Sequence, residues 1–473
     1  MGSRENHRRN KLKNRIRNDK PLGTLGGDYE GFASPYSGDF QSGNHSVAQT
    51  AQQYLFGLMQ SEKRNMERMV EAVPDSDYQV LQNFLTHSSW EHRGVMDRTA
   101  GNANTWIGAE VGAGLYIDES AFEKKGEKSV GVARQWNGRL GKQDNCQVGV
   151  FGALGRGDRV SLIDARLYLP KEWTDDAARC EEAGVPRAQQ VHRTKTELAE
   201  EIVRHARAIG VRFEWVGMDG GYGKSLELLE SLHAQGEVFV ADIHSDRHIY
   251  LQDPAPHLPQ QKSGFGRKPL GLRYHSNAQS IEVRKWLQKQ PASAWRPQTL
   301  RDTTRGDLRV EVMHRHVWLW DKHGPSAHRW HLIVRREVNS PATVKYSLSN
   351  ADDQTSVNKL AQMQAQRFWI ERAFQDAKSH VGMADYQARM WQSWHRHMAL
   401  VMMAMQFMLE TRIKNAELLP LLSCYDIQIL IATTMPDRRS DSDEVIRQLH
   451  ERHRKRQASI DSAHLNETRN SLT

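Results

Sequence analysis

The sequence has few cysteines and lacks a long apolar run. Among its 473 residues are three cysteines, Cys146, Cys180 and Cys424, which are widely spaced and form no CxxC pair. This usage predicts no disulfide framework and favours a reducing cytosol. The longest apolar run, MALVMMAMQFML from Met398, falls short of the about 18 residues that a membrane span needs, and predicts a buried helix. No apolar segment follows the basic N-terminus, so we expect no secretion signal and no membrane partner.

Basic residues exceed acidic ones. Lys and Arg number 65 and Asp and Glu number 57, which gives a formal net charge of +8 and a pI near 9.3. This balance suits a polyanionic partner, although many basic proteins have none. A hydrophobic content of 38% argues against wholesale disorder, and the length predicts more than one domain.

Composition and periodicity divide the chain into six segments. The pattern predicts an α/β fold in which a mixed-sheet core is interrupted by a mostly β insertion and preceded by a helical domain. The expected segments are a basic flexible arm (1–42), a helical domain (43–105), the first part of the core (106–245), the β-rich insertion (246–343), the second part of the core (344–435) and a charged tail, frayed or disordered (436–473). The helical domain could bind DNA ends, although helical spacing alone does not show this.

The core shows antiparallel strands followed by alternating helices and strands. Runs such as GLYID, CQVGVF and SLIDARLYL predict strands, TELAEEIVRHARAI predicts an amphipathic helix, and WVGMD and VFVADI predict two further strands. In the insertion, LRVEVMHRHVWLW and HRWHLIVRREV predict a β-hairpin. The segment YSLSNA then resumes a strand, and a long helix follows.

Two aspartates end apolar strands. Asp118 ends GLYID, and Asp219 ends WVGMD and is followed directly by glycines. If these strands are parallel neighbours, both carboxylates project from one edge of the sheet. A strand-end or turn residue is the simpler interpretation of either aspartate alone. Glu119 is a rival to Asp118, but strand alternation would point it to the opposite face.

A third carboxylate lies on the helix RFWIERAFQDAK. At about 100° per residue, Arg367, Glu371 and Lys378 share one narrow stripe beside a separate apolar face. Asp376 lies near 180° from Arg367, far from the stripe. Taken alone, the stripe is explained by an i,i+4 ion pair on a solvated face, which would stabilise the helix by only about 0.3–0.5 kcal/mol.

Carboxylates that converge at one edge repel each other unless a cation lies between them. Mg²⁺ prefers oxygen ligands, and two such ions can hold the attacking and leaving oxygens of a phosphoryl displacement. If Glu371 joins Asp118 and Asp219 at such a site, then Arg367 and Lys378 would hold the DNA backbone.

These motifs, in this order over residues 45–430, resemble the bacterial insertion-sequence DDE transposases that have a Y-x2-R-x3-E-x6-K signature and a β insertion before the glutamate. The resemblance rests on YIDESAFEKKG, SLIDARLYLP, WVGMDGGYG, YSLSNA and RFWIERAFQDAKSH. It implies an RNase H-like core, Mg²⁺ or Mn²⁺ as cofactor, transposon-end and target DNA as partners, a homodimer at synapsis and a cytoplasmic, nucleoid-associated location. It also implies cleavage of the terminal inverted repeats, usually through a hairpin, and joining of the 3′-OH ends to target DNA.

The resemblance assigns residues by position. Asp118, Asp219 and Glu371 correspond to the catalytic, metal-binding triad, and Arg367 and Lys378 correspond to the basic residues of the signature. Tyr222 matches the tyrosine that follows the second aspartate. Where the signature has its tyrosine, this chain has Gln364, which retains a donor for a DNA phosphate but loses ring stacking.

Several other features have simpler interpretations. The basic loop Lys262–Gly271 resembles a minor-groove arm, but a surface loop is at least as good an interpretation. His314 and His316 are spaced like metal ligands, but solvent-facing strand histidines are favoured. For His395, His397, Trp391 and Trp394, core positions are favoured over DNA contacts. Two other functions stay open: a domesticated protein that only binds DNA, and a metal nuclease without strand transfer.

Overall fold

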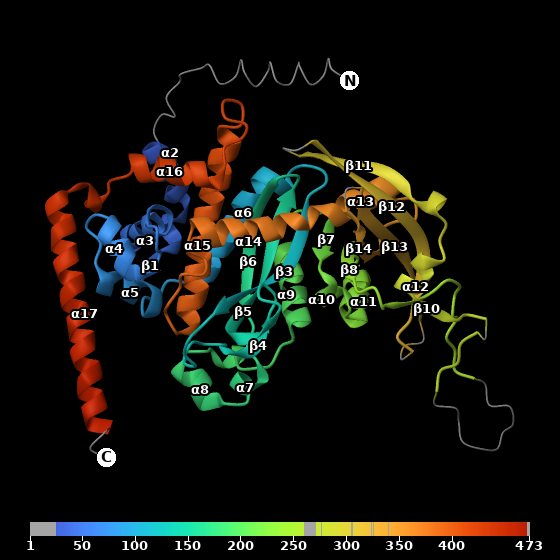
Figure 1. Ribbon diagram of the computed structural model, residues 1–473, viewed down its shortest axis with the longest axis horizontal. Coiled ribbons are helices and arrows are strands. Elements are labelled where there is room, and N and C mark those ends of the chain that lie inside the picture. Colours follow the sequence, from blue (N-terminus) through green and yellow to red (C-terminus); the bar gives the residue numbers. More distant parts are fainter. Residues whose placement is uncertain are drawn as a thin grey trace. The chain divides into compact units, whose positions relative to one another are not determined.

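The computed structural model (Figure 1) describes residues 25–259, 271–275, 277–303, 306–322, 324, 326–338 and 340–470. Most of the predicted basic arm and of the loop Lys262–Gly271 lies outside these residues. The chain forms two compact units. One comprises Thr99–Phe374, and the other joins the chain up to Arg98 with the chain from Gln375 onward. Helices α6 (His92–Ala103) and α14 (Phe368–His380) run across the two boundaries.

The unit Thr99–Phe374 is built on a single twelve-stranded mixed sheet. Its order is β10-β9-β12-β13-β14-β8-β7-β3-β5-β4, with β11 beside β12 and β6 beside β5. The strands are β3 (Gly114–Glu123), β4 (Ala133–Asn137), β5 (Lys142–Arg156), β6 (Arg159–Leu167), β7 (Trp215–Met218), β8 (Phe239–Ile243), β9 (His248–Tyr250), β10 (Ser280–Glu282), β11 (Arg296–Thr303), β12 (Gly306–Leu319), β13 (His328–Glu337) and β14 (Ser340–Ser349). This mixed α/β architecture is consistent with an RNase H-like catalytic core.

The strands predicted as an insertion do not form a separate sheet. Strand β14 pairs antiparallel with β8, so that Ser347 lies opposite Asp242, and the hairpin β12–β13 continues outward from β14. In Figure 1 the yellow and brown strands accordingly extend the sheet that begins with the green and cyan strands. Strand β14 therefore belongs to the same sheet as the strands that carry the predicted catalytic aspartates.

Helices cover this sheet and fix its central strands. Thr194 and Glu197 form a capping box at the start of α9 (Lys195–Ala208), which satisfies backbone donors at the helix end. Helix α9 packs so closely on β5 that a Cβ at Gly152 would lie 2.6 Å from the Ile202 side chain. The remaining helices of this unit are α7 (Lys171–Thr174), α8 (Ala177–Glu182), α10 (Gly220–Gly223), α11 (Leu226–Ala234), α12 (Val283–Gln288), α13 (Val357–Gln366) and three short turns, η2 (Asn104–Gly108), η3 (Arg187–Gln189) and η4 (Ala292–Ala294).

The other unit is helical and is organised around α15 (Trp391–Lys414), of which most residues are buried. The Tyr54 hydroxyl lies 2.9 Å from Nδ1 of His397, and Arg396 donates to the carbonyls of Trp90 and Leu85. Helices α3 (Ala48–Gln60), α5 (Tyr78–Thr86) and α16 (Cys424–Thr434) pack against α15. The unit also contains α2 (Leu25–Ala33), η1 (Ser34–Asp39), β1 (Gln41–Ser42), β2 (His45–Ser46), α4 (Met66–Ala72), η5 (Arg438–Ser440) and α17 (Ser442–Asn470).

The charged C-terminal segment is not frayed, contrary to the expectation from its composition. It forms α17, which is stabilised along its own surface by the i,i+4 pair of Lys455 with Glu451. Contacts to α4 add to this, since Arg452 pairs with Glu71 and Gln448 donates to the Glu71 carbonyl. No helix among the described residues is both long and apolar enough to cross a membrane.

Candidate active site

Three aspartates lie at matching positions on three neighbouring parallel strands. Strand β3 pairs parallel with β7, and β7 pairs parallel with β8. Ile117 is opposite Met218, and Met218 is opposite Ala241. The next residue along the chain is in each case an aspartate: Asp118 within β3, Asp219 directly after β7, and Asp242 within β8. The expected parallel pairing of the first two strands is confirmed, and it aligns Asp118 with Asp219. The expected strand end is found only at Asp219, because β3 continues past Asp118 to Glu123 along its antiparallel partner β5.

Asp219 ends its strand and begins the next helix. Its carboxylate caps α10 by accepting hydrogen bonds from the backbone N–H groups of Gly221 and Tyr222, at 2.9 and 3.2 Å. The glycines of the GGYG turn let this helix approach the sheet, because a Cβ at Gly223 would lie 1.9 Å from the Asp242 carbonyl oxygen. One carboxylate oxygen of Asp219 is thus held by the backbone, which fixes the direction of the other.

Arg367 lies between the carboxylates. It occupies the junction of α13 and α14, and its side chain is only 13% exposed. Its guanidinium contacts three acids, with distances of 3.2 Å to Asp118, 3.3 Å to Asp242 and 2.9 Å to Glu371. The predicted i,i+4 pair with Glu371 therefore exists, but the same arginine also turns inward to two strands of the sheet. Glu371 itself is about half exposed, at 51%.

The electrostatics of the site are those of a buried cluster with excess negative charge. Burial, opposed by Arg367 but reinforced by Asp219 and Glu371, raises the pKa of Asp118 to about 7. Burial would lower the pKa of the Arg367 guanidinium, but the surrounding carboxylates, Asp242 first, raise it instead. Three carboxylates thus pair with one guanidinium, while Asp219 accepts only backbone hydrogen bonds, so negative charge exceeds positive charge in the cluster.

A chain of hydrogen bonds reaches the site from the insertion strands. Arg335 donates to the Gln364 side-chain carbonyl at 2.9 Å, and the Gln364 amide donates to Ser347 Oγ at 2.6 Å. Ser347 Oγ in turn donates to Asp242 at 2.5 Å. Gln364 is buried, at 4% exposure, so its two polar groups are used inside the protein. In this structure it orients Asp242, and through it Arg367, where the sequence suggested a contact with a DNA phosphate.

The other predicted site residues have different surroundings. Tyr222 is buried, and within the described residues its hydroxyl has no hydrogen-bond partner. Burial together with the charges of Glu119, Asp118 and Asp219 raises its pKa well above the ordinary value. Lys378 is half-buried in the last turn of α14, beyond the boundary at Phe374. Glu119 points away from Asp118 and pairs with Lys195 at 2.7 Å, as strand alternation predicted.

The donor set fits a hard divalent cation. All candidate ligands are carboxylate oxygens, the negative charge exceeds the positive, and a cation beside Asp118 would favour the ionised form of this carboxyl, whose pKa is raised to about 7. Within the described residues these oxygens do not form a closed group of three atoms with mutual distances under 4.8 Å. The guanidinium of Arg367 lies among them, so a cation would have to take its place beside Asp118 and Glu371.

Asp242 was missed by the sequence analysis. The signal was available, because the run VFVAD ends on an aspartate just as GLYID and WVGMD do. Its importance came only from the pairing of β7 with β8, which is not local in the sequence. Asp376, the rival to Glu371, is buried beside Cys424 in the helical unit.

Most of the histidine and tryptophan assignments hold. Trp391, Trp394, His395 and His397 are all buried in α15, as expected of core residues. The expectation for His314 and His316 is wrong, because neither faces solvent freely. Both are half-buried and lie against the buried His331.

Comparison with known proteins identifies the class. A family model described as "DDE superfamily endonuclease" matches residues 40–307, more than half of the chain. The protein belongs to this family, and the matched residues include Asp118, Asp219 and Asp242. The chain is also similar to the "Probable transposase for insertion sequence element IS701" of Microchaete diplosiphon. The two are 24% identical over 335 residues, which cover 69% of this chain and 72% of the relative.

Proposed function

We propose that this protein is a DDE transposase that cleaves the terminal inverted repeats of its own element and joins the 3′-OH ends to target DNA. The observation that supports the proposal is the contact of Arg367 with Asp118 on β3 and with Glu371 on α14, while the parallel strand β7, which pairs with β3, leads directly into Asp219. Membership of the endonuclease family and the similarity to a transposase support it.

In this proposal Asp118, Asp219 and Glu371 hold divalent cations, Mg²⁺ or Mn²⁺. Bound there, the cations would neutralise phosphate charge and activate the attacking oxygen. Asp219 contributes a carboxylate whose direction is set by two backbone N–H groups. Arg367, released from Glu371, offers a planar fork of donors that matches a phosphate. Lys378 lies on the same helix and would add a second positive charge along the DNA.

Asp242 is an alternative third ligand, because it lies in register with the other two aspartates. Its contacts favour a positioning role, since one oxygen accepts from Ser347 and the other pairs with Arg367. Mn²⁺ titration followed by electron paramagnetic resonance would decide whether Glu371 or Asp242 is the third metal ligand. We expect Glu371→Gln to weaken Mn²⁺ binding by about 100-fold, and Asp242→Asn to weaken it by about 10-fold.

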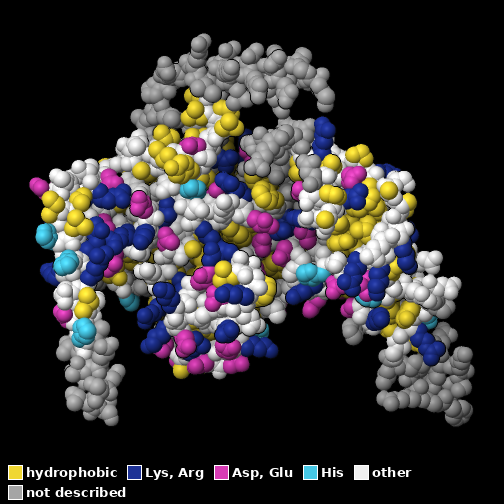
Figure 2. Space-filling view, in the orientation of Figure 1, with side chains coloured by type: hydrophobic (Ala, Val, Ile, Leu, Met, Phe, Trp, Pro, Cys, Tyr) yellow, Lys and Arg dark blue, Asp and Glu magenta, His cyan; other side chains and the backbone are white. Residues whose placement is uncertain are grey.

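DNA binding is proposed for the helical unit. A cleft of about 820 Å³ lies between α4 and α17, and its basic lining residues outnumber its acidic ones. Figure 2 shows Lys and Arg side chains gathered over these two helices. The basic residues of the cleft are Arg68, Arg438, Arg447, Arg452, Lys455 and Arg456. Such a surface suits the phosphates of the element's ends. Synapsis of two ends would require a homodimer. A hairpin intermediate on the element ends, as in related enzymes, is also expected.

The test uses linear DNA that carries both flanks of the reading frame. With Mg²⁺, we expect nicks at the element boundaries and, with pre-cleaved ends and a plasmid target, joined product. A shifted band without nicks would show a binding protein that has lost its activity. Nicks without joined product would show a nuclease that lacks strand transfer. Either outcome would overturn the proposed function.

A further inference from the structure

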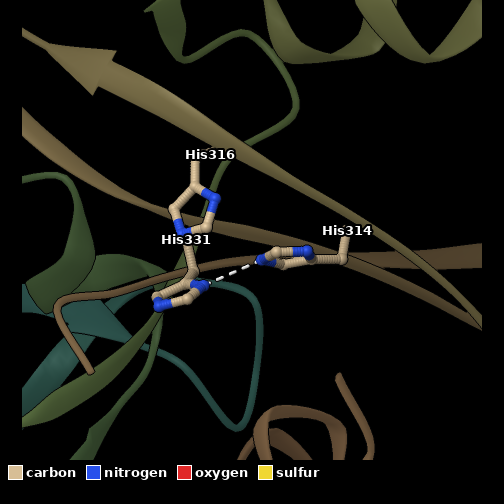
Figure 3. Close-up of side chains that lie close together, drawn as sticks. All are labelled: His314, His316 and His331. Atoms are coloured by element: carbon tan, nitrogen blue, oxygen red, sulfur yellow. Dashed lines mark hydrogen bonds between the residues drawn. The ribbon is translucent and has the colours of Figure 1, made fainter. Parts of the chain in front are cut away.

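Three histidines of the extended sheet converge away from the carboxylates. His316 on β12 lies directly opposite His331 on β13, and His314 is two residues before His316. Because side chains alternate along a strand, all three point to the same face. Their ring centroids are 4.4 to 5.1 Å apart, and one ring nitrogen of each lies within 4.8 Å of the others (Figure 3).

The hydrogen bonds orient one of these rings as a metal ligand. Nε2 of His331 lies 3.1 and 3.2 Å from the carbonyl oxygens of Ala351 and Asp352. Since a carbonyl only accepts, Nε2 carries the proton, and the lone pair of His331 is on Nδ1. That atom faces Nε2 of His314 at 2.8 Å. A backbone carbonyl on the far nitrogen is the usual way in which a protein orients a metal-binding histidine.

The third ring, that of His316, has a nitrogen whose hydrogen-bonding capacity is not fully used. Nε2 of His316 is buried and lacks a well-directed hydrogen bond, although an oxygen of Asp353 is 3.1 Å away. Asp353 also pairs with Arg329. A buried ring nitrogen beside a carboxylate, with two further imidazoles in reach, is an arrangement that a cation completes.

The charge state of the cluster also favours a metal. Burial, followed by the neighbouring His331, His316 and Arg296, lowers the pKa of His314 to about 4. Burial, His331 and Arg329 lower the pKa of His316, against the opposing effect of Asp353. Both rings are therefore neutral at pH 7, and neutral imidazole is the form that binds metals.

We propose that His314, His316 and His331 form a binding site for a divalent transition metal of the Zn²⁺ type, independent of the carboxylate site. Imidazole nitrogens suit Zn²⁺, whereas the oxygen ligands of the active site suit Mg²⁺. Zn–N bonds of about 2.0–2.1 Å in a tetrahedral site place ligand nitrogens about 3.3 Å apart. His314 and His331 would thus separate by about 0.5 Å as the metal replaces their hydrogen bond. The fourth position is left to water or Asp353.

The position of the cluster indicates a structural role. The carbonyls that hold His331 belong to Ala351 and Asp352, which connect β14 to α13. Helix α13 ends at Gln366, next to Arg367. A metal on the three histidines would therefore tie the hairpin β12–β13 to the segment that leads into the active-site helices.

The test is a metal titration of the full-length protein without a polyhistidine tag. After treatment with EDTA, the protein is titrated with Co²⁺ as a visible-absorbing probe, and then with Zn²⁺. We expect one tightly bound Co²⁺ per chain with the absorption of a four- or five-coordinate site, displaced by Zn²⁺ but not by a large excess of Mg²⁺. The variants His314→Gln and His316→Gln should each weaken binding by about 100-fold or more.

His328→Gln is the matched control, because His328 lies on the same strand as His331 but pairs with Glu230. It should bind Co²⁺ like the wild type. Far-UV circular dichroism verifies that each variant is folded before titration, and His316, which is only half-buried, is the mildest change. The proposal is overturned if the wild type binds no Co²⁺ tightly, or if His316→Gln binds it as the wild type does. Loss of the tight Co²⁺ in Asp219→Asn would also overturn it, since the metal would then belong to the carboxylates.

Discussion

Replacing Arg367 by alanine removes the guanidinium that contacts Asp118, Asp242 and Glu371. Two of these carboxylates are largely buried, at 13% and 19% exposure. They would be left without a positive partner in the metal-free protein. The half-exposed Glu371 can turn to solvent and should contribute little.

The expected loss follows from breaking a buried ion pair, which typically costs about 3–5 kcal/mol. Protonation of Asp118, whose pKa is already about 7, limits the penalty near neutral pH. We therefore expect Arg367→Ala to lower the free energy of unfolding by about 3 kcal/mol, which lowers the Tm of a domain of this size by about 6 °C. Mg²⁺ no longer competes with an arginine in this variant. At about 100 times its Kd, Mg²⁺ should raise the free energy of unfolding of the variant by about 2.7 kcal/mol.

The assay is differential scanning calorimetry at pH 7.5, in EDTA and in Mg²⁺. Arg204→Ala is the control, because Arg204 forms an i,i+4 pair with Glu200 and is 63% exposed. An exposed pair of that kind is worth about 0.3–0.5 kcal/mol, or about 1 °C at most. The reasoning is refuted if Arg367→Ala in EDTA melts within about 2 °C of the wild type, or if Mg²⁺ stabilises both proteins equally.

Three further predictions concern Asp118, Gln364 and the cleft of the helical unit. Because the folded protein binds the Asp118 proton more tightly than the unfolded chain does, the metal-free protein should lose up to about 4 kcal/mol of stability as the pH rises from about 4 to about 7. Urea unfolding in EDTA should show that the unfolding free energy of Asp118→Asn depends less on pH than that of the wild type. An unchanged pH dependence would contradict the raised pKa of Asp118. Gln364→Ala should slow cleavage by about 10–100-fold with unchanged end binding. The control Gln362→Ala, on the same helix, should cleave like the wild type. Cleavage by Gln364→Ala at the wild-type rate would show that Gln364 does not position Asp242. Arg456→Ala should reduce the salt dependence of end binding by about one phosphate contact, and an identical slope would place the DNA elsewhere.

Much of the fold was accessible from local patterns. The strand-forming runs, the capped helix α9 and the buried helix α15 follow from apolar periodicity. The aspartates at the ends of GLYID and WVGMD could be paired because parallel neighbouring strands align the ends of the two runs, although β3 itself continues beyond Asp118 to Glu123. The helical projection also predicted the Arg367–Glu371 pair, since it depends only on a spacing of four residues.

What escaped prediction depends on pairing between distant segments. The contact of Arg367 with Asp242 needs β7 and β8 to be neighbours and α13 to pack beside them, and no local pattern reports either. His331 joins His316 only through the register of a hairpin. The burial of Gln364 and Tyr222 arises from packing, and it changes a predicted phosphate contact into an internal one. Composition also misled at α17, where charged residues form helical ion pairs.

The most direct measurement compares the wild type with Asp219→Asn on DNA carrying the element's ends, by metal-dependent cleavage and by electrophoretic binding. Asparagine caps a helix as well as aspartate does, so α10 should persist and end binding should stay within about twofold. Cutting in Mg²⁺ should fall below detection. Cleavage by Asp219→Asn at the rate of the wild type, or the joint loss of cleavage and binding, would contradict a catalytic carboxylate at this edge of the sheet.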